Sequence, residues 1–254
     1  LTGYTIFSNT RKILYDSIRS RATSIKDGFL YLVAQEKVRL SHNVEDYAKW
    51  TEMGEKGVRE EDKEWLAENL EPWVRRHFGY ELVILAKSNG KVISKGKSPE
   101  ISVEELINTD GTTKSGFYLC KDGLILFSSS GVFDNDGINF YNAYLIFGKL
   151  VTEEILRRWK SILQADIVLS IPSRIYTTNP NLKEANIGPE SYGYQSRYIT
   201  VSIPVIEGDR ELGRFYLYRE DNALYNIYRS FIISTVLSIV SGLLIAIILA
   251  RFLI

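Results

Sequence analysis

Arginines beside a long polar segment are the residues of this sequence best suited to bind a charged ligand. Arg174, Tyr176 and Arg197 lie within or next to residues 173–194, which we predict to be a loop. A guanidinium group presents a planar fork of N–H donors that fits a carboxylate or a phosphate. Exposed arginines are more often simply solvated, so both interpretations stay open for Arg174 and Arg197.

A second group of candidates is aromatic. The chain has 16 Tyr, 11 Phe and 4 Trp, and Tyr118 and Tyr144 fall on segments with the pattern of strands. Ordinary core packing is one interpretation of these rings. The other is a pocket with apolar walls and phenol hydrogen-bond donors. On that interpretation the candidate ligand-binding residues are Tyr118, Tyr144, Arg174 and Arg197.

No motif in the sequence predicts a metal, a cofactor or catalysis. Residues 134–137 read Asp-Asn-Asp-Gly, but Leu145 stands where a calcium loop needs a bidentate glutamate, so we expect a turn. Residues 96–98 lack the glycine spacing of a phosphate-binding loop. The chain has two histidines and a single cysteine, Cys120, which leaves little material for a zinc site and none for an internal disulfide.

The charged residues are distributed unevenly, so the chain consists of a charge-rich part and an uncharged segment near its C-terminus. The chain of 254 residues carries 31 Lys and Arg against 31 Asp and Glu, a balance that excludes the basic surface nucleic acid needs. Residues 231–250 contain none of these charges. A helix of this length spans about 30 Å, the thickness of a bilayer's hydrocarbon core, whereas a buried core helix is usually shorter. We predict residues 219–254 to be a juxtamembrane and transmembrane helix.

The N-terminal part is dominated by one helical pattern. Apolar residues recur at steps of three and four over residues 8–50, which predicts a long amphipathic helix. Residues 1–7 are apolar and aromatic, and we expect them to be the end of an earlier membrane helix or of a signal peptide. We expect residues 51–64 to be a solvated loop and residues 65–78 to form a second helix, kinked or broken at Pro72.

From residue 80 onward the period changes to that of strands. Asn89-Gly90 and Asp122-Gly123 are hairpin signals between alternating apolar segments, and residues 153–165 predict a further helix. We expect five to seven antiparallel strands in one sheet. The predicted fold is α+β: residues 8–218 form a domain in which the long helix packs on the sheet, and the membrane helix follows.

Short motifs in this chain resemble one family of receptor domains. Residues 43–52 read NVEDYAKWTE, residues 65–70 WLAENL and residues 143–149 AYLIFGK. They are similar to the type-four CHASE domain, an extracellular sensor of bacterial and archaeal receptors in the Cache, or PAS-like, group. Four residues match the family pattern: Asp46, Tyr47, Trp50 and Asn69. Thr51 departs from the usual acid, and Ala143 replaces a glycine.

The resemblance implies a PAS-like sensor flanked by two membrane helices, with residues 8–218 outside the cell. It implies that a HAMP-like linker or kinase module follows the second helix in the cytoplasm. It also implies that Asp46, Trp50 and Asn69 are structural and tie the long helix to the sheet.

Two functions from different classes follow. The first is the input domain of a transmembrane receptor, which binds a small and, through its arginines, anionic ligand and passes a conformational change to the membrane helix. Two copies of the long helix could pair, so we expect a homodimer. The alternative is a membrane-tethered interaction or dimerisation scaffold that senses no small molecule.

Overall fold

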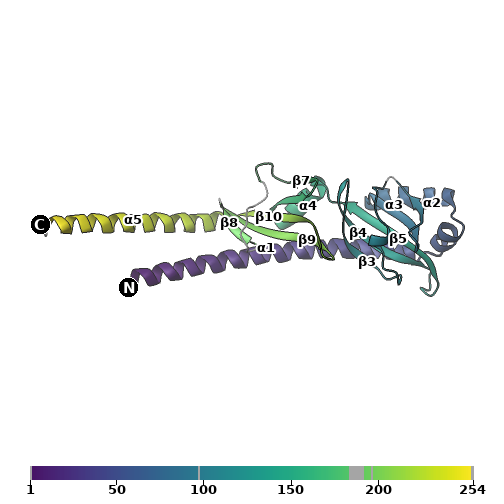
Figure 1. The fold of residues 1–254 in the computed structure, drawn as a ribbon, viewed down its shortest axis with the longest axis horizontal. Coiled ribbons are helices and arrows are strands. Elements are labelled where there is room, and N and C mark those ends of the chain that lie inside the picture. Colours follow the sequence, from purple (N-terminus) through teal and green to yellow (C-terminus); the bar gives the residue numbers. More distant parts are fainter. Residues whose placement is uncertain (1, 97, 183–191, 196, 253–254) are drawn as a thin grey trace.

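The molecule is a rod built along one helix (Figure 1). The computed structural model describes residues 2–96, 98–182, 192–195 and 197–252. Helix α1 (Thr2–Ala48) contacts strands of both sheets. The other elements, in chain order, are η1 (Met53–Arg59), α2 (Lys63–Asn69), α3 (Glu71–Phe78), β1 (Leu82–Lys87), β2 (Val92–Lys95), η2 (Glu104–Leu106), β3 (Lys114–Cys120), β4 (Gly123–Phe133), β5 (Phe140–Leu150), α4 (Glu153–Leu163), β6 (Asp166–Ile171), β7 (Arg174–Thr177), β8 (Tyr192–Gln195), β9 (Tyr198–Glu207), β10 (Arg210–Glu220) and α5 (Asn222–Phe252).

The strands form two antiparallel sheets of five strands each, one after the other along α1. Residues 49–150 make the distal module, whose sheet has the order β2-β1-β5-β4-β3. The described residues of 151–220 make the proximal module, with the order β7-β6-β10-β9-β8. The proximal module lies between the distal module and α5 (Figure 1).

Both faces of the distal sheet are covered. On β1, Val83 and Leu85 pack toward α1, where Val44 belongs to the same buried cluster. The alternate residue Ile84 belongs to the cluster on the opposite face, which Leu106 and its neighbours close. Because side chains alternate along a strand, this double coverage explains why β1 reads as an unbroken apolar run.

The proximal sheet is covered by the first half of α1 and by α4. Phe29 of α1 lies 4.8 Å from Phe215 of β10 and 5.9 Å from Trp159 of α4, measured between ring centroids. All three rings are buried. Residues of α1 at steps of three and four continue this contact toward the N-terminus, as one face of an amphipathic helix must: Ile18, Ala22 and Ile25.

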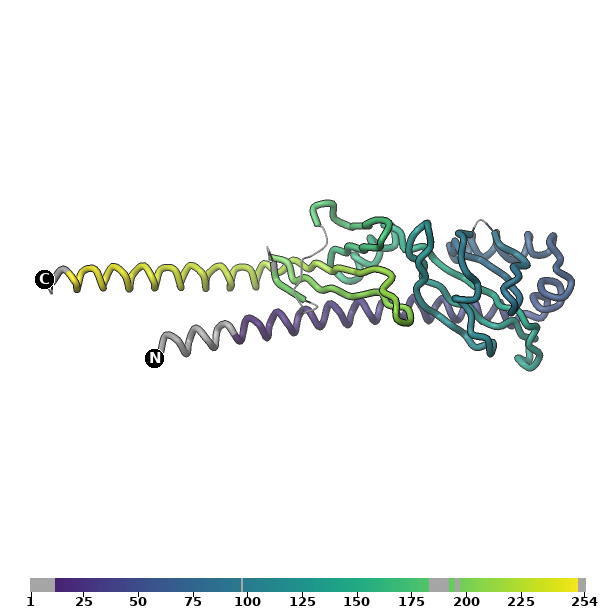
Figure 2. Tube along the Cα trace, in the orientation of Figure 1, coloured from purple at the N-terminus to yellow at the C-terminus, as the bar shows by residue number. Residues whose placement is uncertain are grey.

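Helix α5 leaves the proximal module directly from the end of β10. It is the one helix among the described residues that is long and apolar enough to cross a membrane, over Asn222–Ala250. Leu224 in its first turn packs into the core of the proximal module, and no residue of 225–250 is buried. The tube in Figure 2 shows α5 extending beyond both modules. Helix α1 begins and α5 ends at the same end of the rod (Figure 1).

The predicted α+β class is confirmed, and so is the long N-terminal helix followed by a sheet and a C-terminal apolar helix. The structure divides the strands between two sheets where we expected one sheet of five to seven strands. One sheet and two sheets would show the same repeated hairpin pattern in the sequence. Long-range packing determines which strands pair, and local periodicity carries no information about it.

Two segments predicted to be loops contain regular structure. Within residues 51–64, the π-helix η1 buries Met53 and Val58, because two small residues, Gly54 and Gly57, allow the helix to pack closely. Within residues 173–194, strands β7 and β8 form the two edges of the proximal sheet, while residues 183–191 lie outside the described residues. The loop prediction was therefore wrong for both segments.

Candidate ligand-binding pocket

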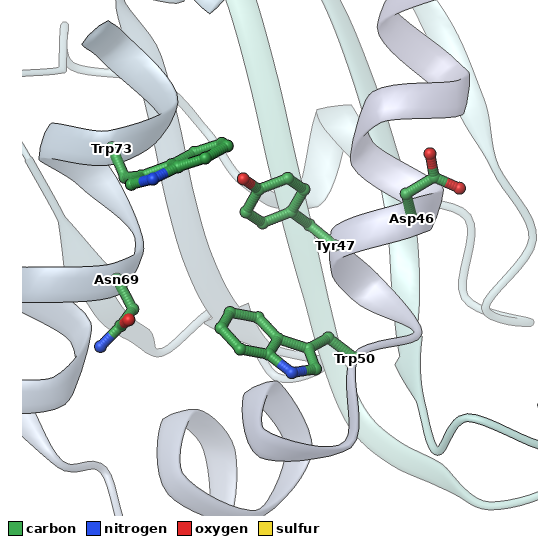
Figure 3. Close-up of a pocket in the computed structure, with 5 residues that line it drawn as sticks. All are labelled: Asp46, Tyr47, Trp50, Asn69 and Trp73. Carbon is green, nitrogen blue, oxygen red and sulfur yellow. The ribbon is translucent and has the colours of Figure 1, made fainter. Parts of the chain in front are cut away.

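A cavity of about 370 Å³ opens at the far end of the distal module, between the end of α1 and the helices α2 and α3. We call it the aromatic pocket. Its lining residues are Asp46, Tyr47, Trp50, Asn69 and Trp73. Figure 3 shows Tyr47 between Trp73 on one side and Trp50 on the other. Four of the five lining residues, all but Trp73, belong to the motif that resembles the CHASE family.

Local helix geometry accounts for the position of the two walls. Tyr47 lies in the last turn of α1, which ends at Ala48, and Trp50 follows in the turn after it, where its ring packs against that of Tyr47. The opposite wall begins at Asp62, whose carboxylate accepts the backbone N–H groups of Glu64 (3.1 Å) and Trp65 (3.0 Å) and so caps α2. Helix α3 starts anew after a break at Leu70 and carries Trp73 to the pocket.

The rings of the pocket meet at different angles. The Tyr47 and Trp50 rings are nearly perpendicular, at 89°, with centroids 6.4 Å apart. The Tyr47 and Trp73 rings are tilted by 45°, with centroids 5.7 Å apart. His77 stacks on Trp73 at 3.7 Å, which occupies one face of that indole. Trp73 is nonetheless 40% exposed, so the pocket has aromatic walls that are open to solvent.

The polar groups of the pocket are few. Asn69 donates through Nδ2 to the carbonyl oxygen of Trp65 (3.0 Å), and this leaves its own Oδ1 as an acceptor. Burial raises the pKa of Tyr47 to about 12, so its hydroxyl stays neutral. Within the described residues the exposed carboxylate of Asp46 has no hydrogen bond or ion pair, and it points away from the rings (Figure 3).

A second and larger cavity, of about 890 Å³, separates the two modules. We call it the inter-module cleft. Phe117 and Tyr118 of β3 line one side, and the turn from Glu207 to Arg210 lines the other. Arg210 Nη2 reaches across to Glu105 Oε2 at 2.8 Å, so an ion pair joins the modules.

The cleft also has an amine beneath it. Lys37 of α1 places its Nζ 5.2 Å from the centre of the Phe117 ring. Burial lowers the pKa of this amine, and the carboxylate of Glu207 acts in the opposite direction. The cleft is therefore lined by charges of both signs together with aromatic rings.

The four residues predicted to bind a ligand do not come together. Tyr144 is fully buried, and its hydroxyl accepts the backbone N–H of Gly111 at 3.2 Å. Tyr118 lines the inter-module cleft, and its hydroxyl accepts the N–H of Ser102 at 3.1 Å. Both phenols thus satisfy backbone groups of the distal module.

The two predicted arginines lie in the other module. Arg174 is exposed on β7 with its guanidinium 5.6 Å from the centre of the Tyr176 ring. Arg197 follows β8, has a φ of 72°, and pairs with Glu220 at 3.3 Å. Because β7 and β8 are opposite edges of one sheet, the two arginines cannot hold a single small anion in this arrangement.

The three residues predicted to be structural do share one place. Asp46, Trp50 and Asn69 all line the aromatic pocket. Trp50 packs on Trp65 at 5.2 Å between centroids, while the contact of this region with the sheet runs through Tyr47 and Phe147, 5.7 Å apart. Asp46 makes no polar contact with the sheet in the described structure, so aromatic packing holds the helix end there.

Sequence reasoning missed Trp73 as a partner of this motif. The available signal was its position four residues after Asn69 in a segment already predicted to be helical. It also missed the charged contacts of the cleft, Lys37, Glu207 and Arg210, which lie far apart in the sequence and offered no local signal.

Residues 134–137 form a turn, as the sequence predicted, and the Asp134 carboxylate closes it by accepting the N–H of Ile138 at 2.8 Å.

No group of three His, Cys, Asp or Glu side chains that could hold a metal ion is present in the described part of the chain. The described pockets instead offer rings, amides and isolated charges. Such groups bind a small molecule by shape and charge, as ligand pockets in general do.

Known proteins were compared with this chain in sequence and in structure. The periplasmic domain of Vibrio cholerae LuxQ superposes with a TM-score of 0.54 at 12% identity, covering 79% of this chain and 98% of that domain. The ligand-binding domain of the Pseudomonas fluorescens chemoreceptor CtaA, solved with L-isoleucine, gives a TM-score of 0.46 at 9% identity, covering 88% of this chain and 99% of that domain. No curated protein sequence matches.

The LuxQ superposition establishes a shared fold. The evidence for the family comes from the sequence itself: the CHASE4 domain family matches residues 32–170, which is more than half of the chain. This range starts within α1 and ends in β6, so it contains the aromatic pocket and the whole distal sheet. The chain belongs to the CHASE4 domain family.

Proposed function

We propose that this chain is the extracellular sensory input domain of a transmembrane receptor. The observation that carries the proposal is the junction at Asp221, which lies between the last strand and the apolar helix α5. Its side chain is 7% exposed. A sensor needs a rigid connection between its folded part and its membrane helix, and this residue connects three elements there.

The contacts of Asp221 define that connection. Its carboxylate accepts the backbone N–H of Leu224 at 2.9 Å and so caps α5, and it pairs with Arg21 of α1. Its backbone N–H donates to the carbonyl oxygen of Arg197 at 2.9 Å, at the turn between β8 and β9. A shift of the proximal sheet against α1 therefore has to move the start of α5.

The signal is a change in the population of two packings of the modules. Ligand binding favours one packing only by its differential affinity, for which about 1–3 kcal/mol of coupling is typical. The helix α5 passes the change through the membrane to a HAMP-like or kinase module in the cytoplasm. The domain boundaries of the proposal are the end of a first membrane helix at 1–7, the sensor at 8–218 and the second membrane helix at 219–254.

The working unit is a homodimer, and an exposed face of α1 supports this. Tyr31, Ala34 and Val38 are exposed on α1 at the spacing i, i+3 and i+7. This spacing places apolar side chains along the seam of a coiled coil. The role is binding and transmission without catalysis.

Arg174 and Arg197 remain proposed anion contacts, but as two separate sites. Each guanidinium is exposed and could meet a carboxylate or phosphate at its own edge of the proximal sheet. The aromatic pocket is the better-formed site, because it is concave and several side chains converge on it.

The orientation is tested by labelling the whole chain in the inner membrane of a bacterium. Cys120→Ser removes the native thiol, and Asp136→Cys places a new one on an exposed turn of the distal module. A membrane-impermeant maleimide is expected to label intact spheroplasts. Labelling that requires permeabilised membranes would place the modules in the cytoplasm and refute the proposal.

The sensory role is tested in two steps on the chain in detergent micelles. A thermal-shift screen against carboxylates, amino acids, phosphates and alkylammonium compounds identifies ligands. Spin labels at Ser20 of α1 and Ser230 of α5, both exposed, then report the distance between the helices with and without a hit. A sensor changes this distance, whereas a ligand that binds and leaves it unchanged favours the tethered scaffold.

A further inference from the structure

We propose that the aromatic pocket binds an alkylammonium group, and that trimethylammonium is the best-fitting form. The inference rests on the sensory role proposed above and names the chemical class that the site takes.

The angles between the rings favour a compact cation over a flat ligand. A flat ring stacks on one aromatic platform, but here the Tyr47 ring stands at 89° to Trp50 and at 45° to Trp73. Walls in different planes surround a roughly spherical group. The centroids of Trp50 and Trp73 lie 6.4 and 5.7 Å from that of Tyr47, so a group beside Tyr47 can approach this ring together with a neighbouring indole. Aromatic faces attract a cation within about 6 Å of the ring centre.

The charge of the lining agrees with this geometry. The only ionisable group with a full charge at neutral pH among the lining residues is the carboxylate of Asp46 at the rim. Tyr47 stays neutral because burial raises its pKa, and Asn69 contributes an amide. A cation therefore meets ring faces, with the Asp46 carboxylate at the rim pointing away from the rings, and no cationic side chain is among the lining residues. A small anion meets no donor with a positive charge.

The size and the opening of the pocket limit what can enter. Its volume of about 370 Å³ lies at the lower end of the range of small-molecule sites. Trp73 is 40% exposed, so the tail of a longer ligand can remain in solvent. The pocket lies at the opposite end of the rod from α5 (Figure 1), which separates it from any lipid headgroup at the membrane. The two sources of such a cation are therefore a free small molecule and a methylated lysine of another protein.

Calorimetry of the whole chain tests the inference directly. The chain is kept in dodecyl maltoside micelles, which contain no choline, at low ionic strength so that Asp46 is not screened. The ligands are choline and its uncharged isostere 3,3-dimethylbutan-1-ol, which has the same shape without the charge. We expect saturable choline binding and an affinity for the isostere about tenfold lower. Absent choline binding, or equal affinity for the two, overturns the inference.

Variants of the pocket assign the binding to the rings. Trp73→Leu is expected to lower choline affinity about tenfold, whereas Trp73→Phe retains most of it, because phenylalanine keeps an aromatic face. Tyr15→Leu, on the exposed side of α1 and away from the pocket, is the matched control and leaves affinity unchanged. Circular dichroism checks that each variant is folded. Equal affinities of Trp73→Leu and the wild type would contradict the proposal.

The carboxylate is tested in the same way. Asp46→Asn is expected to weaken choline binding about two- to threefold at low salt, because an exposed charge contributes modestly. Asp27→Asn, an exposed acid elsewhere on α1, is its control. A peptide carrying trimethyllysine distinguishes the two sources: tighter binding of the peptide than of choline identifies a methylated protein, and the reverse identifies a free small molecule.

Failure of this inference differs from failure of the sensory role. Suppose that the chain does not bind choline, but that another ligand changes the distance between the labels on α1 and α5. The alkylammonium assignment is then wrong, and the sensory role still holds.

Discussion

The junction at Asp221 gives the most direct prediction about transmission. Asp221→Ala removes two interactions at once: the cap of α5, through Leu224 N–H at 2.9 Å, and the ion pair with Arg21. Asp221→Asn keeps a side chain that caps helices equally well and removes only the negative charge. The two substitutions therefore separate capping from pairing.

The magnitudes follow from burial. Replacing a good cap by alanine costs about 0.5–2 kcal/mol. The side chain of Arg21 is 41% exposed, so the pair is valued like a surface pair, at about 1 kcal/mol or less. We expect about 1–3 kcal/mol for Asp221→Ala and about 1 kcal/mol or less for Asp221→Asn. Arg21→Ala falls between them, because it leaves a 7% exposed carboxylate without its counter-ion.

Tryptophan fluorescence provides the assay, since all four tryptophans lie in the modules and none in α5. For a folded part of this size, 1 kcal/mol shifts Tm by about 2–4 °C. Asp221→Ala is therefore expected to lower Tm by about 2–12 °C. The spin-label distance between Ser20 and Ser230 should also broaden, because the start of α5 is no longer held. The variant Arg21→Ala in the Asp221→Asn background should add little to Asp221→Asn alone.

The reasoning is refuted by a specific combination of results. If Asp221→Ala keeps Tm within about 1 °C and keeps a narrow distance distribution, the junction is not what couples the modules to α5. If Asp221→Asn is as damaging as Asp221→Ala, the ion pair and not the cap dominates, and the assigned magnitudes are reversed.

Three further predictions concern other parts of the molecule. Gly131→Ala places a Cβ 2.8 Å from the carbonyl oxygen of Gly111, so thermal unfolding should show a loss of about 1–3 kcal/mol. Burial lowers the pKa of Lys37, so the unfolded chain holds its proton to higher pH and stability should rise with pH between the lowered pKa and the ordinary value of 10.5. Unfolding curves at several pH values should show that Lys37→Met loses this rise. For a carboxylate or phosphate ligand, at most one of Arg174→Ala and Arg197→Ala should weaken calorimetric binding, and an effect of both would contradict their separation on opposite sheet edges.

The two cavities lie in different places relative to the modules, one within the distal module and one between the two modules. The aromatic pocket is built within the distal module, by residues of α1, α2 and α3 and of the turn after α1. The inter-module cleft is crossed by the pair of Arg210 and Glu105 at 2.8 Å. A ligand that tightens the end of α1 acts on the same helix that carries Lys37 beneath the cleft and Arg21 at the junction.

Helical and membrane features could be predicted from the sequence because their signals are local. The apolar stripe of α1 and the uncharged residues 231–250 each specify a helix by composition within a few turns. Hairpins at glycine turns predicted most strands for the same reason. The motif around Asp46, Trp50 and Asn69 carried enough information to indicate the family, which the match over residues 32–170 confirms.

Tertiary structure decided what those elements build. Which hairpins share a sheet depends on burial against α1 and α4, so one predicted sheet became two, and η1 is helical because Met53 and Val58 are buried. Tyr144 is a residue type that often contacts ligands, but here its hydroxyl accepts the backbone N–H of Gly111 inside the core. Trp73 became part of a pocket because α3 starts anew after Leu70 and its Trp73 ring packs against Tyr47 of α1, 5.7 Å between centroids. A residue's type limits the chemistry it can do, and only the packing of distant segments determines whether that chemistry faces a ligand or the core.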